Sequence, residues 1–116
     1  GAFNDERILK VCQLVGRPLC HSIGVLESSR CGLAAWLGLN AYFTAGCAQF
    51  PVNRKGVSMV TPASVAHARR LGLQVHAWTI NDESTMHNLI DMGVDGIMTD
   101  DCALLKSVLI KRNMWA

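Results

Sequence analysis

Residues 60–100 decide the fold, and they read VTPASVAHARRLGLQVHAWTINDESTMHNLIDMGVDGIMTD. Thr61 and Pro62 start a helix, because Thr is a favoured N-cap and Pro suits the first helical position. Apolar residues then recur at helical spacing as far as Gly72, where we expect the helix to end. Residues 73–80 follow as an apolar run of strand length. This part of the stretch therefore predicts a helix that leads into a buried strand.

The remainder of the stretch repeats the same order of elements. Residues 81–83, Asn-Asp-Glu, cap a second helix that closes at Gly93. Residues 94–99 form another apolar strand, and a last helix carries its apolar residues within 104–109. Ahead of the stretch, the polar residues 53–56 predict a turn.

The first half of the chain shows this alternation less sharply. A helix follows Asn4 and stops at Gly16, and a second helix, rich in small apolar residues, lies within 27–39. Short strands are predicted near residues 18–23 and 48–52.

The predicted strands are apolar on both faces and are separated by helices. This pattern is typical of an α/β fold with a parallel sheet and right-handed connections. Residues 1–3 read as the end of a further strand, so the chain is expected to begin inside a strand. We therefore predict that residues 1–116 are a single unit and a piece of something larger.

Composition excludes several functional classes. Half of the residues are apolar, 17% are charged and the formal net charge is +2, with Lys and Arg scattered, which does not fit a nucleic-acid-binding protein. Residues 31–53 carry no charge, but their Gly, Asn, Gln and Pro residues argue against a transmembrane span. The five cysteines form no Cys-x-x-Cys pair. We expect free thiols and a cytoplasmic location.

Three motifs resemble the glycerophosphodiester phosphodiesterase family. They are Val-Thr-Pro at 60–62, Val-His-Ala-Trp-Thr-Ile-Asn at 75–81 and Gly-Val-Asp-Gly-Ile-Met-Thr-Asp at 93–100. Residues 2–5, 22–24 and 49–51 are similar to other strand ends of that family, more loosely.

The resemblance implies a partial TIM barrel, about strands 4–8 with the intervening helices. Residues 1–3 would then end strand four. The sequence departs from the family pattern at Ala2, where Ser is usual, and at Asp101-Cys102, where a basic or polar residue and then Pro are usual.

The family that the chain resembles hydrolyses glycerophosphodiesters to glycerol 3-phosphate and an alcohol. It uses a His-Arg motif, a second His and carboxylates that hold a divalent metal, Mg²⁺ or Ca²⁺. This chain has no His-Arg-Gly and no Glu-Asp pair at strand spacing. We therefore assign it no catalytic and no metal-ligating residue, and we expect the chain alone to bind no cofactor and to be inactive.

The resemblance does place three substrate-binding candidates at strand ends, Trp78, Phe3 and Gln49. Trp78 would line the substrate site near the end of strand seven, and the alternative is a core Trp packed between sheet and helix. His76 shares a strand face with Trp78.

The other polar candidates have structural interpretations. We interpret His76 and His67 as satisfied structural histidines, His21 as a weaker pocket candidate and His87 as exposed. The carboxylate pairs follow strands and open helices, where capping and the helix dipole favour acidic residues. These pairs are Asp5-Glu6, Asp82-Glu83 and Asp100-Asp101.

Three functional hypotheses stay open. The chain is part of a phosphodiesterase, a non-catalytic half-barrel that acts as a partner module, or a different TIM-barrel enzyme that shares only strand-end patterns. Because a half-barrel has open sheet edges, we also predict that the isolated chain self-associates.

Overall fold

The computed structural model describes residues 4–24, 27, 30, 33, 45–54 and 56–116. The strand end predicted at 1–3 and most of the helix predicted within 27–39 lie outside the described residues. The candidate Phe3 lies outside them as well.

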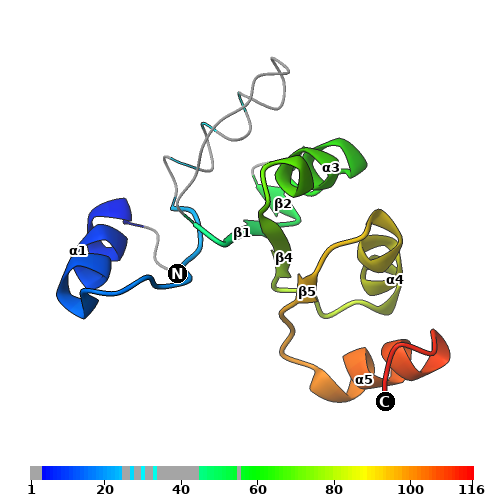
Figure 1. Cartoon of the computed structure of the whole chain (residues 1–116). Helices are drawn as coiled ribbons and strands as arrows, with labels where there is room; N and C mark the ends of the chain where they lie inside the picture. Colours follow the sequence, from blue (N-terminus) through cyan, green and yellow to red (C-terminus); the bar gives the residue numbers. More distant parts are fainter. Residues whose placement is uncertain (1–3, 25–26, 28–29, 31–32, 34–44, 55) are drawn as a thin grey trace.

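The described helices and strands alternate along the chain (Figure 1). The helices are α1 (Asp5–Val15), α3 (Pro62–Arg70), α4 (Glu83–Met92) and α5 (Cys102–Lys111). The strands are β1 (Cys47–Pro51), β2 (Asn53–Arg54), β3 (Val57–Ser58), β4 (Gln74–Trp78) and β5 (Gly96–Ile97).

The main sheet is parallel, as the sequence predicts, with strand order β1-β4-β5. β4 is the central strand, so its backbone is paired on both sides. The strand predicted at 18–23 is reduced to an isolated parallel bridge between Ser22 and Cys47. The first two residues of the turn predicted at 53–56 instead form β2, which pairs antiparallel with β3 in a short hairpin after β1.

Side-chain caps fix where the carboxyl-terminal helices begin. Thr61 and Ser64 form a reciprocal capping box at α3, each side chain accepting a backbone N–H of the other. Asp82 accepts from the backbone N–H of Thr85 at α4, and Asp101 does the same for α5. These caps confirm the helix starts that the sequence predicts.

The carboxyl ends of two helices differ in how they use glycine. Gly93 ends α4 with φ of 82°, a left-handed conformation that glycine adopts without steric cost. Gly72 was expected to end α3, but the helix stops at Arg70 with Leu71 as its C-cap. Gly72, at φ 74°, instead turns the chain toward β4.

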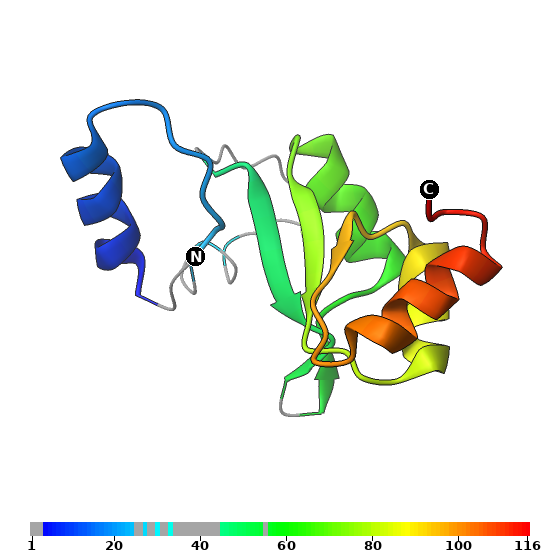
Figure 2. The ribbon, with the colours of Figure 1, turned by 90° about the horizontal axis from the view of Figure 1, so that it is seen from below.

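The core lies between the sheet and the helices that cover one of its faces (Figure 2). α3, α4 and α5 all lie on this side, and their apolar residues meet the inward residues of β4. Core residues on these elements include Val65, Ala68, Val75, Ala77, Met86, Leu89 and Val108.

Charged side chains also join α4 to α5. Lys111 donates to the Glu83 carboxylate at 2.7 Å, and this hydrogen bond and the Lys111 charge hold the pKa of Glu83 below its usual value. Arg112 contacts both Asp91 and the His87 ring. The expectation that His87 is exposed is therefore wrong: its side chain is half-buried between these partners.

α1 lies apart from the sheet in both views (Figures 1 and 2). Asn4 caps it by accepting from the Glu6 backbone N–H, and Gly16 ends it in a left-handed conformation. Ile8 is its buried residue among those described, while Leu14 is 77% exposed.

The four cysteines in the described part of the chain are all free thiols. Burial, with a smaller contribution from Cys20, raises the pKa of Cys47. Within the described residues, no helix is both long enough and apolar enough to cross a membrane.

His67 is buried on α3, and the expectation that it is fully satisfied is wrong. Its Nδ1 lies 3.1 Å from an Arg70 guanidinium nitrogen, which only donates, so the neutral ring carries its proton on Nε2. Nε2 is buried and has no hydrogen-bond partner among the described residues. Burial, followed by the Arg70 charge, lowers the pKa of His67.

This histidine should make stability sensitive to mild acid. Its pKa is lower in the folded than in the unfolded chain, so its contribution is present above the unfolded pKa of about 6.5 and is lost as pH falls through the folded pKa. We expect the urea midpoint to fall between about pH 7 and about pH 5, and His67→Gln to reduce that fall. His21→Gln is the control, because His21 bonds an adjacent backbone carbonyl. An unchanged pH dependence in His67→Gln would refute the assignment.

Candidate substrate-binding site

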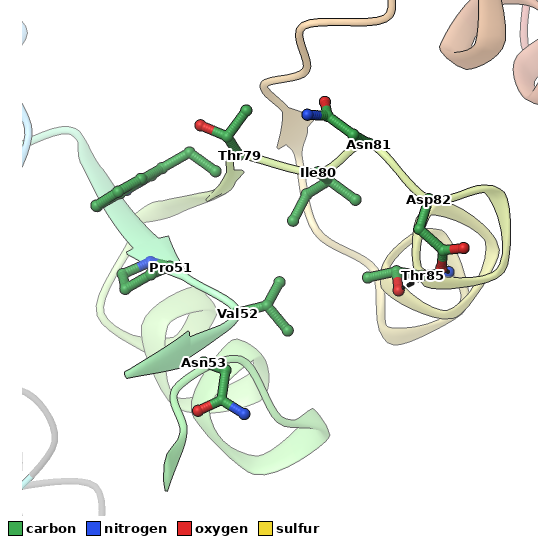
Figure 3. Close-up of a pocket in the computed structure, with 9 residues that line it drawn as sticks. Pro51, Val52, Asn53, Thr79, Ile80, Asn81, Asp82 and Thr85 are labelled. Carbon is green, nitrogen blue, oxygen red and sulfur yellow. Dashed lines mark hydrogen bonds between the residues drawn. The ribbon is translucent and has the colours of Figure 1, made fainter. Parts of the chain in front are cut away.

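An open cleft of about 520 Å³ lies at the carboxyl ends of β1 and β4 (Figure 3). Its lining comes from the end of β1 and the start of β2 (residues 51–53), from the end of β4 and the loop after it (residues 78–82), and from Thr85 of α4. In sheets of parallel strands with helical connections, ligands bind at this end of the strands.

Trp78 reaches the cleft because of the alternation along β4. Val75 and Ala77 are buried and face the helices, whereas His76 and Trp78 are half-buried and face the other way. Trp78 is the last residue of the strand and pairs with Pro51 of β1, so both lie at the rim. The structure thus places Trp78 in the cleft lining rather than in the core between sheet and helices.

Gln49 lies one layer below this rim. It pairs with His76, and its Nε2 lies 3.5 Å from the His76 Nδ1. His76 in turn pairs with Gly96 of β5, where a Cβ atom would come within 2.9 Å of the imidazole Cδ2. Gln49 is absent from the described cleft lining, and its role in substrate binding stays a prediction. His76 fills space between strands, in keeping with a structural role.

Asn81 ties the ends of two strands together, which the sequence did not predict. Its Oδ1 accepts hydrogen bonds from the Thr99 hydroxyl at 3.0 Å and from the Asp100 backbone N–H at 2.9 Å. Its Nδ2 donates to the Asp100 carboxylate at 2.9 Å. We expected Asn81 to help cap α4, but Asp82 alone fills that role. The sequence signals that could have predicted this contact are Asn81 directly after β4 and Thr99-Asp100 after β5.

Asp82 serves both as the α4 cap and as a cleft residue. Its Oδ2 accepts from the Thr85 hydroxyl, the Ser84 hydroxyl and the Thr85 backbone N–H, each at 2.7 Å. The side-chain hydrogen bond from Thr85, followed by that from Ser84, lowers the pKa of Asp82 to about 2. The carboxylate is therefore ionised at neutral pH. The capping interpretation is confirmed for Asp82 and for Asp101, while Asp100 bonds Asn81 instead.

The described residues contain no group of three His, Cys, Asp or Glu side chains that could hold a metal ion. His21, a weaker pocket candidate, bonds the backbone carbonyl of Ser22 and lies outside the cleft lining.

Comparison with known proteins identifies relatives for most of the chain. The sequence model of the glycerophosphoryl diester phosphodiesterase family matches residues 33–104. A probable glycerophosphodiester phosphodiesterase 2 from Mycobacterium tuberculosis (strain ATCC 25618 / H37Rv) is 38% identical over 125 aligned positions, covering 99% of this chain and 46% of that protein. A glycerophosphodiester phosphodiesterase from Bacillus subtilis (strain 168) is 29% identical, covering 85% of this chain and 32% of its own length.

A solved structure is also similar. The glycerophosphodiester phosphodiesterase from Parabacteroides distasonis ATCC 8503 matches with a TM-score of 0.50 and 26% identity, over 60% of this chain and 28% of that one. The chain thus spans less than half the length of each of these relatives.

The Asn81 contacts should contribute to stability. We expect Asn81→Ala to lower the free energy of unfolding by about 1–2 kcal/mol, because it removes three exposed hydrogen bonds whose partners then turn to water. Chemical denaturation measures this change. Asn88→Ala, at an exposed position of α4, is the matched control and should stay within about 0.5 kcal/mol of the parent. Equal effects of the two variants would argue against a tie between the strand ends.

Proposed function

This chain belongs to the glycerophosphoryl diester phosphodiesterase family, and on that premise we propose that it forms part of the substrate-binding mouth of a glycerophosphodiester phosphodiesterase. Its fold is a partial TIM barrel, with parallel strands and intervening helices. The proposed reaction is hydrolysis of a glycerophosphodiester to glycerol 3-phosphate and an alcohol.

The observation that carries the proposal is the position of Trp78. It lies at the carboxyl end of a parallel strand and lines the cleft there, where barrel enzymes bind their substrates. The Asn81 contacts with Asp100 hold the neighbouring strand end beside it, so the rim is fixed by hydrogen bonds. Such fixed rims favour precise placement of a ligand.

The chain's own residues bind and orient in this proposal, and they do not carry out the hydrolysis. The sequence has no His-Arg motif, and the described residues include no group of three His, Cys, Asp or Glu side chains placed to hold a metal ion. We place the catalytic groups and the ligands of a divalent cation, Mg²⁺ or Ca²⁺, in a part of the barrel outside this chain. A cytoplasmic location is part of the proposal, and its support is the odd count of five cysteines with no Cys-x-x-Cys pair.

Hydrolysis should therefore require the part of the barrel that supplies the catalytic groups, which this chain lacks. The purified chain, with Mg²⁺ or Ca²⁺, is expected to release no glycerol 3-phosphate from glycerophosphocholine above buffer. Adding the part of the Mycobacterium tuberculosis relative that this chain does not cover should restore release. Trp78→Ala should then reduce the release by about tenfold or more.

Two results would count against this proposal. Metal-dependent turnover by the chain alone would reveal an active site within it, with Asp82, Asp100 and Trp78 as the first positions to change. If this chain and the added part of the relative form a stable complex that shows no turnover, the proposed phosphodiesterase activity is wrong.

A second candidate function is supported by the surface of α1. Its apolar side chains remain largely exposed: Leu9 is 59% exposed and Leu14 is 77% exposed. A helix that leaves such residues in water gains free energy by covering them, at about 25 cal/mol per Å² buried. We infer that the isolated chain self-associates through this helix and acts as a non-catalytic half-barrel.

Light scattering after size exclusion tests this inference. The chain should elute as a dimer or larger species, and Leu9→Glu with Leu14→Glu should shift it toward monomer. Gln13→Glu adds a charge at an exposed polar position of the same helix and is the control. A monomer that melts cooperatively would contradict self-association.

A further inference from the structure

We propose that Cys20 and Cys47 form a reversible disulfide when the protein meets a peroxide, and that this bond ties residues 20–23 to the first residue of β1. The inference goes beyond the proposed function and does not depend on it. It concerns the start of β1, at the opposite end of that strand from the cleft.

The backbone places the two cysteines on neighbouring stretches of chain. Ser22 pairs with Cys47 in the isolated parallel bridge, and the Ile23 N–H donates to the Cys47 carbonyl at 2.9 Å. Paired residues direct their side chains to the same face, and alternation along an extended chain gives Cys20 the same face as Ser22. Both thiols are free in the structure.

The Cys20 sulfur lies against the residue that precedes Cys47. A Cβ atom on Gly46 would come within 2.7 Å of the Cys20 Sγ and 3.9 Å of the Cys20 Cβ. Because a disulfide holds its two Cβ atoms about 3.5–4.5 Å apart, Cys20 needs a displacement of only one residue to meet Cys47. Residues 17–20 are exposed and belong to no helix or strand, so this displacement disturbs no packed core.

The two thiols differ in exposure, which decides their order of reaction. Cys20 is exposed, whereas Cys47 is 7% exposed. Burial, followed by the charge of Cys20, raises the pKa of Cys47. Because charges act more weakly with distance, the second cause agrees with the two thiols being neighbours. Peroxide therefore meets Cys20 first, and Cys47 is protected from direct attack.

The reaction has two balanced steps. The Cys20 thiolate attacks one oxygen of hydrogen peroxide, the O–O bond breaks, and Cys20 becomes a sulfenic acid. The other oxygen leaves as hydroxide and takes up the proton that the thiol released. The Cys47 thiol then loses its proton, its sulfur bonds to the Cys20 sulfur, and the S–O bond breaks to release a second water. Each sulfur loses one electron, the peroxide gains two, and thiols such as glutathione reverse the bond by exchange.

Peptide mapping of the native chain before and after treatment with hydrogen peroxide tests the proposal. The treated chain should lose two of its five thiols, and dithiothreitol should restore both. Chymotryptic cleavage after Leu14 separates Cys20 from the cysteine before it, and cleavage after Trp36 does the same for Cys47. A linked pair of peptides therefore identifies the bond.

Variants connect the bond to its effect on stability. Oxidation of the parent should raise its urea midpoint, because a bond between residues 20 and 47 restricts the unfolded chain. Cys20→Ala should keep Cys47 reduced and should show no such rise. Cys12→Ala removes a partly buried thiol of α1 and is the matched control, since it should still form the bond.

Four results would overturn the inference. Cys47 could stay a thiol while Cys20 is oxidised, or both could stay thiols after treatment. Either cysteine could bond to a different cysteine or to a second chain. Finally, the bonded form could have a urea midpoint no higher than that of the reduced chain.

Discussion

The two parallel pairings of β4, with β1 on one side and β5 on the other, are the constraint on which the rest of the structure depends. Because a paired strand alternates its side chains, Val75 and Ala77 must face the helices while His76 and Trp78 face away. The core and the cleft are thus two consequences of one register. A shift by one residue would exchange them, burying Trp78 under the helices and exposing the apolar core residues.

Polar residues at the strand ends divide two tasks between them. Asp82 and Asp101 start helices, whereas Asn81 joins the strand ends through Asp100. The capping residues determine where each helix begins, and the amide determines how the two loops lie beside each other. Asp82 caps α4 and also lines the cleft.

The exposed apolar residues and the sheet edge of this chain suggest that its proposed activity requires a second polypeptide segment. α1 leaves Leu9 and Leu14 in water, and β5 is paired with a described strand on one side only. Contact with further polypeptide would bury the exposed leucines and would pair the free side of β5. The proposed function assigns that contact to a complementary half that also brings the catalytic groups, and self-association would cover the same surfaces without them. Recognition and hydrolysis are in this view properties of different parts of one barrel.

The sequence by itself determined the alternation of helices and strands over residues 60–111, the parallel sheet and the family, because capping residues, apolar periodicity and strand-end motifs are local features. It did not predict the hairpin β2–β3, and the strand it predicted at 18–23 is an isolated bridge. The family resemblance, which rests on the same motifs, singled out Trp78 as a candidate at a strand end, and a core position was the alternative. Tertiary structure alone decided that Asn81 bonds Asp100, that Gln49 lies a layer below the rim, and that His87 is held between α4 and α5. These contacts join residues far apart in the chain, and their geometry exists only once β4 and its neighbours have paired and the helices have packed on them.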